Sequence, residues 1–135
     1  TESASRHEWN LGQLVRERVG GAALLVGFTT YTGHVCAASE WGGEAERKWV
    51  RPARPDSWEH VFHSTGLDRF LLPLGDTAAD VFHEPLLERA IGVLYLPKTE
   101  YASHYFDAAI GAQFDALIHL DETSAIEPLT TALLP

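Results

Sequence analysis

The chain is 135 residues long and carries 19 acidic against 10 basic side chains, a formal net charge of −9. This length suits one folded domain, and an apolar content of 45% is ordinary for a protein with a packed core. The negative charge repels a phosphate backbone and no basic stripe overrides it, so we expect no nucleic-acid partner. Because no apolar run reaches the ~18 residues of a membrane-spanning helix and no signal-peptide pattern opens the chain, we expect no membrane association.

The only cysteine is Cys36. A lone cysteine cannot form an internal disulfide, which fits a reducing compartment, so we expect a cytoplasmic protein. Cys36 lies in an apolar run with no histidine or asparagine partner beside it. We therefore interpret it as a buried, unreactive thiol rather than a nucleophile.

The first recognisable element is a helix that begins at Asn10, a good N-cap residue, and ends at Gly20 and Gly21. The continuously apolar run at residues 22–28 follows, which predicts a strand buried on both faces. We predict a polar turn at residues 29–33 and a second strand at residues 34–39.

Shorter elements follow, separated by prolines and glycines. A helix is predicted over residues 58–64, capped by Asp56 or Ser57, and a helical turn over residues 85–89. Residues 103–113 fit either a helix or an ordered loop. Further strands are predicted at residues 45–50, 68–74, 90–96 and 114–120.

Buried strands separated by helices or long connections predict an α/β fold with a mixed or largely parallel sheet and flanking helices. Two confident helices cover such a sheet poorly, so we expect residues 1–135 to be an incomplete part of a larger α/β domain. The absence of methionine fits a fragment. Residues 1–9 are expected to be flexible, residues 75–80 to form a loop and residues 124–135 to form an irregular tail.

Two histidine arrangements suggest chemistry, each with a plainer alternative. His60 and His63 lie three residues apart on a predicted helix, a spacing that suits two metal ligands, but further ligands are missing and both fit an amphipathic helix equally. Strand alternation places His119 and Asp121 on one side of a strand, so the carboxylate could orient the imidazole. The alternative is a structural hydrogen-bonded pair. We assign no metal ligand.

Two polar segments are candidates for lining a pocket. One contains Thr30 and Tyr31, after the first apolar strand, and the other contains Ser103, His104 and Tyr105. Neighbours in sequence seldom form a nucleophile–base pair, and no Gly-x-Ser-x-Gly elbow is present. We predict no catalytic residue and no cofactor. The predicted pocket-lining residues are Thr30, Tyr31, Ser103, His104, Tyr105 and His119.

Many stretches, in order, resemble segments of the erythromycin esterase family, among them VGFTTYTG at 26–33 and QFDALIH at 113–119. The resemblance covers nearly the whole chain. The other stretches that carry the resemblance lie at residues 10–17, 37–43, 45–47, 57–59, 89–93, 103–106, 121–123 and 127–129.

This resemblance implies an α/β hydrolase of ester or lactone bonds, in which a histidine activates water with help from glutamates and a second histidine. Those motifs lie before the region that resembles this chain, so none transfers to a residue here. We expect a C-terminal portion that is inactive alone, whose partners are the remainder of the parent polypeptide and a small-molecule ester or lactone. Self-association through bare strand edges is also expected. The alternatives are a non-catalytic binding or assembly module and a small enzyme with its own metal at His60–His63 or His104.

Overall fold

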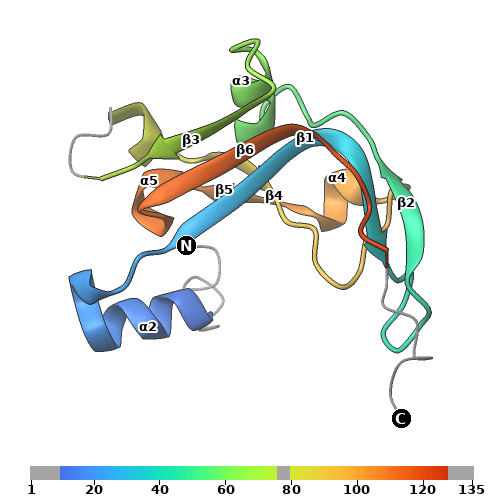
Figure 1. The fold of residues 1–135 in the computed structure, drawn as a ribbon, viewed down its shortest axis with the longest axis horizontal. Helices are drawn as coiled ribbons and strands as arrows, with labels where there is room; N and C mark the ends of the chain where they lie inside the picture. Colours follow the sequence, from blue (N-terminus) through green and yellow to red (C-terminus); the bar gives the residue numbers. More distant parts are fainter. Residues whose placement is uncertain (1–9, 76–79, 128–135) are drawn as a thin grey trace.

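A four-stranded mixed sheet organises the computed structural model, which describes residues 10–75 and 80–127 (Figure 1). The strand order is β2-β1-β6-β3, with β1 parallel to β6 and the other two pairings antiparallel. An α/β fold with a mixed sheet and flanking helices is thus confirmed. The strands are β1 (Val26–Ala37), β2 (Glu46–Val50), β3 (Arg69–Pro73) and β6 (Ala116–Thr123).

Strand β1 is longer than predicted and runs straight through the expected turn at residues 29–33. Its first part pairs with β6 and its last part with β2, and Gly33 belongs to both pairings. Gly33 has φ +125°, and a Cβ there would lie 2.1 Å from the Thr123 carbonyl oxygen, so only glycine fits. The turn prediction was wrong because β-branched threonines suit a strand once a distant partner supplies the ladder.

One face of the sheet carries the main core. Helix α3 (Trp58–His63) packs there, and Ser57 caps it as expected, its Oγ accepting a hydrogen bond from the His60 N–H. A two-stranded sheet of β4 (Leu86–Arg89) and β5 (Tyr105–Ala108) lies against the same core. The buried core residues are Trp58, Phe62, Leu74, Ala108, Ile110 and Leu117.

Two of the predicted elements differ in the structure. The expected helical turn at residues 85–89 is strand β4, since its residues pair with β5. The expected strand at residues 90–96 is a connection, in which Leu94 forms an isolated bridge with Ala38, the residue after β1. Its apolar character serves a second small core instead, where Tyr95 packs with Ala37 and Val50.

The remaining helices are short. Residues 103–113, left open between helix and loop, contain β5 and α5 (Ile110–Gln113). The other short elements are η1 (Gly20–Ala22), η2 (Asp80–His83) and α4 (Glu100–Ser103). Residues 1–9, 76–79 and 128–135 lie outside the described part. The predictions of a flexible segment at residues 1–9, of most of the loop at residues 75–80 and of most of the tail at residues 124–135 fall on them.

The opposite face of the main sheet is open. Phe28 of β1 is 68% exposed and Leu71 of β3 is 63% exposed, and half-buried Ile118 lies between them in register. The expectation that residues 22–28 are buried on both faces was therefore wrong. The described helices pack on the other face or beside the sheet.

Helix α2 (Leu11–Val19) begins at Asn10 as predicted, with Asn10 Oδ1 accepting a hydrogen bond from the Gln13 N–H at 2.8 Å. Figure 1 shows α2 beside the start of β1 and away from α3. Arg16 ties it to Asp115, yet the helix has no buried residue and Leu11 is 77% exposed. Among the described residues, no helix has the length and apolar character needed to cross a membrane.

Candidate functional site

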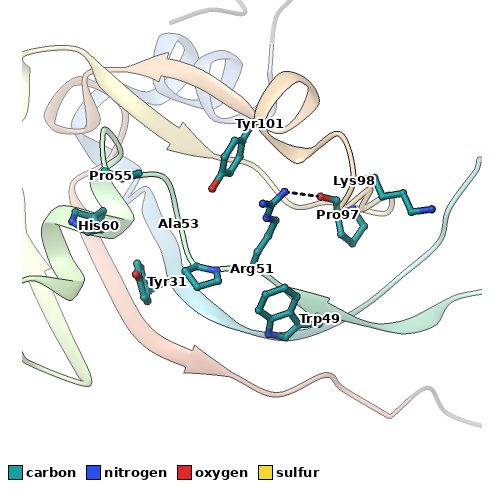
Figure 2. A pocket seen from close by; sticks show the side chains of 10 residues that line it. Tyr31, Trp49, Arg51, Ala53, Pro55, His60, Pro97, Lys98 and Tyr101 are labelled. Carbon is teal, nitrogen blue, oxygen red and sulfur yellow. Dashed lines mark hydrogen bonds between the residues drawn. The ribbon is translucent and has the colours of Figure 1, made fainter.

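A hollow of about 590 Å³ lies where the end of β2 meets α3 and the segment around α4 (Figure 2). Its volume is within the range of small-molecule sites. Aromatic side chains, prolines and cations make up most of the wall, and among residues 10–75 and 80–127 no carboxylate belongs to it. The lining residues are Tyr31, Trp49, Arg51, Pro52, Ala53, Pro55, His60, Pro97, Lys98 and Tyr101.

The floor of the hollow is the proline-rich segment that ends β2. Strand β2 ends at Val50, and Pro52, two residues later, has no N–H with which to continue a sheet ladder. Two hydrogen bonds then hold this segment in place. The Ala53 N–H donates to the Tyr31 carbonyl at 3.0 Å, and the Arg54 N–H donates to the Tyr105 hydroxyl at 3.1 Å.

Arg51 is the cation at the centre of the hollow. Its Nη1 donates to the Pro97 carbonyl at 3.3 Å, the contact drawn in Figure 2, and its Cζ lies 4.6 Å from the centre of the Tyr101 ring. Its Nε lies 3.8 Å from a Glu100 oxygen. The side chain remains 38% exposed, so much of the guanidinium faces open space. In Figure 2 the Lys98 ammonium points away from Arg51.

A buried ion pair lies behind Arg51. Arg89 Nη1 lies 2.8 Å from Glu100 Oε1, and both side chains are almost fully buried. The same guanidinium donates to the carbonyls of Arg51 and Tyr31, each at 2.9 Å, and of Thr30, which links the middle of β1 to the residue that follows β2 beside the hollow.

Glu59 is a second buried carboxyl group beside Arg89. Its Oε1 accepts a hydrogen bond from the Arg89 N–H at 2.9 Å, while Oε2 has no hydrogen-bond partner. Burial raises the pKa of Glu59, which favours its uncharged form, although the Arg89 hydrogen bond opposes this. Glu100 Oε2 is likewise buried without a hydrogen bond.

A histidine cluster adjoins the hollow through Tyr31. His63 Nδ1 lies 2.7 Å from Asp121 Oδ1, and the His63 ring stacks on the Tyr31 ring with centroids 3.7 Å apart. We predicted that Asp121 could orient His119, but His119 Nε2 lies 3.5 Å away and makes no hydrogen bond, so His63 is the closer partner. His119 Nδ1 instead lies 2.9 Å from the Thr29 hydroxyl.

The environment of His119 favours its neutral form. Its side chain is completely buried, and this burial lowers its pKa, although the carboxylate of Asp121 opposes the effect. As for a metal, the rings of His60 and His63 are 6.2 Å apart. Within residues 10–75 and 80–127, no three histidine, cysteine or acidic side chains gather closely enough to hold an ion.

The segment with Ser103, His104 and Tyr105 does not line the hollow. Both ring nitrogens of His104 bond to backbone: Nε2 accepts from the Leu96 N–H and Nδ1 lies beside the Ala90 carbonyl, each at 3.0 Å. The Ser103 hydroxyl donates to the Thr99 carbonyl at 2.8 Å. Burial raises the pKa of Tyr105 to about 12. These groups therefore hold loops together.

The two residues of the β1 candidate segment point to different faces of the sheet. Tyr31 lines the aromatic hollow, whereas Thr30 lines a separate hollow of about 380 Å³ with Phe28 and half-buried Cys36. This separation follows from strand alternation.

Sequence reasoning missed Trp49, Arg51 and Tyr101, which line the aromatic hollow together with Tyr31. One signal was available in the sequence. Trp49 and Arg51 stand together immediately before a proline in a strongly acidic chain, an arrangement that places a cation and an aromatic ring at a strand end.

Comparisons with known proteins show one family from the sequence and a shared fold from solved structures. A sequence model described as erythromycin esterase matches residues 1–123. A succinoglycan biosynthesis protein of solved structure superposes with a TM-score of 0.71 at 23% identity. The matched region covers 86% of this chain and 28% of that protein. A Bacillus cereus protein gives a TM-score of 0.70 at 20% identity, covering 84% and 28%. The chain thus spans little more than a quarter of the length of either protein.

Proposed function

The chain belongs to the erythromycin esterase family, and we propose that it is the C-terminal part of a hydrolase of ester or lactone bonds that is inactive alone. The observation that carries the proposal is the open sheet face around Phe28, Ile118 and Leu71. Sheets in α/β enzymes bury both faces, so further elements of the same polypeptide would cover this one.

The chemistry of the described histidines supports the same proposal. General-base hydrolysis needs a positioned base that can reach water and substrate, and donors for the oxyanion. His104 uses both ring nitrogens on backbone groups, and His119 is fully buried. His63 is bound to Asp121 and stacked on Tyr31. In this proposal the water-activating groups come from the rest of the polypeptide, and this chain provides one wall of the cavity.

The proposed partners follow directly. The remainder of the parent polypeptide is the first partner, and the substrate is a small-molecule ester or lactone. We place the protein in the cytoplasm because its single cysteine suits a reducing compartment.

Hydrolysis assays of the chain alone and of the complete reading frame test this function. p-Nitrophenyl esters and a macrolide lactone serve as substrates, with and without zinc or manganese. The chain should release no product above buffer, and the complete polypeptide should turn over. Turnover by the chain alone that His104→Gln or His119→Gln abolishes would overturn the proposal.

A non-catalytic binding module is the second candidate, and one observation favours it. The aromatic hollow around Arg51 is built entirely from described residues of this chain, so it does not need other segments to form. A complete polypeptide that is folded but hydrolyses none of these substrates would favour the module.

A further inference from the structure

The charges around the aromatic hollow are unevenly distributed. Behind Arg51, the carboxylate of Glu100 has two cationic neighbours, Arg89 at 2.8 Å and Arg51 at 3.8 Å. Arg89 is the closer one and is almost fully buried with Glu100. One carboxylate therefore stands between two guanidinium groups, which leaves an excess of positive charge on the Arg51 side.

Other acids near this group do not cancel that excess. Glu59 lies on the Arg89 side, where its Oε1 accepts a hydrogen bond from the Arg89 N–H at 2.9 Å. Asp56 is bound to Arg54, with two contacts of 2.8 Å. His60 is the remaining titratable group of the wall on α3. The positive side of Arg51 thus faces a hollow whose wall holds no carboxylate, in a chain of net charge −9.

Arg51 has hydrogen-bonding capacity to spare. A guanidinium carries five N–H donors, and the described contacts of Arg51 use one on the Pro97 carbonyl, while the Glu100 oxygen is too distant for a normal hydrogen bond. The ring of Tyr101 covers one face of the guanidinium and orients it. Its planar, partly exposed edge is suited to a two-oxygen anion, which it would bind with two parallel hydrogen bonds.

The remainder of the wall is suited to a ring. Trp49 is 54% exposed and Tyr101 is 44% exposed, and both line the hollow with Tyr31 and several prolines. Exposed aromatic faces of this kind stack on flat or alicyclic rings. Figure 2 shows Arg51 between Tyr101 and Trp49, so an anion and an attached ring would both find contacts.

We propose that this hollow binds a carboxylate attached to an apolar ring, with Arg51 holding the carboxylate and Trp49 and Tyr101 contacting the ring. Ester and lactone hydrolysis releases carboxylates, so the assignment of this ligand as the acid product of the reaction rests on the proposed function. The binding itself requires no catalysis. The structure thus assigns the acyl side of the reaction to this wall.

Titration of the chain with sodium benzoate, followed through the indole N–H resonance of Trp49, tests the proposal. Benzoate should saturate a site that shifts this resonance. Benzamide has the same ring without the charge and should bind at least about tenfold more weakly, the value of one charge-assisted contact. Equal binding of benzoate and benzamide, or no saturable shift up to about 50 mM benzoate, would overturn the proposal.

Variants of Arg51 provide a second test with a matched control. Arg51→Gln should weaken benzoate binding about tenfold or more. Arg51→Lys should retain only part of the original affinity, because lysine restores the positive charge but not the pair of parallel N–H donors of the guanidinium. Arg47→Gln removes one charge from β2, outside the hollow, and should leave binding within about twofold. Equal losses in Arg47→Gln and Arg51→Gln would indicate a general charge effect and overturn the assignment. If Arg51→Gln does not fold, the Arg51→Lys and benzamide comparisons decide.

The two proposals fail in different ways. If the complete polypeptide hydrolyses esters while the chain does not bind benzoate, the ligand assignment is wrong and the function stands. If benzoate binds through Arg51 while the complete polypeptide has no hydrolytic activity, the site stands and the hydrolase proposal fails.

Discussion

Phe28 of β1 and Ile118 of β6 are register partners on parallel strands, and both lie on the sheet face that the described helices leave open. Apolar surface of this kind associates in water, because full burial of one large side chain is worth about 2 kcal/mol. We predict that the isolated chain self-associates with increasing concentration and binds a hydrophobic dye. Replacing Phe28 and Leu71 by serine should reduce both effects in sedimentation and fluorescence measurements.

The control for this prediction changes exposed apolar residues elsewhere. Val61 on α3 and Val81 on η2 are 42% and 55% exposed, so Val61→Ser with Val81→Ser removes apolar surface away from the open face. That variant should behave like the original chain. A chain that stays monomeric and dye-free at all concentrations would contradict the prediction.

Local signals predicted much of the framework correctly. Asn10 and Ser57 cap α2 and α3 as expected, and the apolar run before Asp121 forms β6. Local signals failed where residues distant in sequence determine the secondary structure. The threonines at residues 29–33 form a strand because β6 supplies their ladder, and the apolar residues near Tyr95 fill a small core rather than a sheet.

The candidate site was less predictable than the fold. Tyr31 was recognised, but Arg51 and Tyr101 come from segments about fifty residues apart in sequence and meet only through the tertiary fold. Likewise, the alternation that pointed Asp121 toward His119 could not reveal His63, which comes from α3.

Glu88 should make stability depend on pH. Burial, followed by the nearby Glu59, raises its pKa from 4.5 to about 7, so the folded state retains a proton that the unfolded state has lost. This contribution is fully present below pH 4.5 and is lost as pH rises to about 7. Glu88→Gln should therefore stabilise the protein at pH 8, by up to roughly 3 kcal/mol, and have little effect at pH 4.

Urea unfolding of Glu88→Gln at several pH values measures this difference. Glu84→Gln, at an exposed position, is the matched control for the removal of an acidic side chain. A difference between Glu88→Gln and the original chain that stays constant with pH would show that burial does not perturb the Glu88 carboxyl group.

His119 should make stability depend on pH in the direction opposite to that of Glu88. Its folded pKa is lowered below 6.5, mainly by burial, so below about that pH the unfolded state binds a proton that the folded state does not. The stability that the neutral imidazole contributes is present above pH 6.5 and declines as pH falls. His119→Gln should flatten this decline in thermal unfolding series, even if it lowers stability overall. An unchanged slope would exclude His119 as its source.

The buried pair of Arg89 and Glu100 should be sensitive to the loss of one partner. Glu100→Gln leaves the Arg89 guanidinium buried without a counter-charge, which should cost about 3 kcal/mol of unfolding free energy. The double replacement Arg89→Met with Glu100→Leu should cost less than the sum of the single changes in denaturant titrations. Asp56→Asn, which breaks the exposed pair with Arg54, should leave stability nearly unchanged. Additive single changes would show that the two charges do not interact.

Strand β1 is continuous from Val26 to Ala37. At Gly33 its pairing changes from β6 to β2. Because side chains alternate along a strand, Phe28 and Tyr31 consequently point to opposite faces of the sheet. Deleting one residue between them would turn Tyr31 out of the aromatic wall or Phe28 into the core. An element that packs over Phe28 on the open face would therefore help to fix the position of Tyr31 in the hollow around Arg51, although it contacts neither residue.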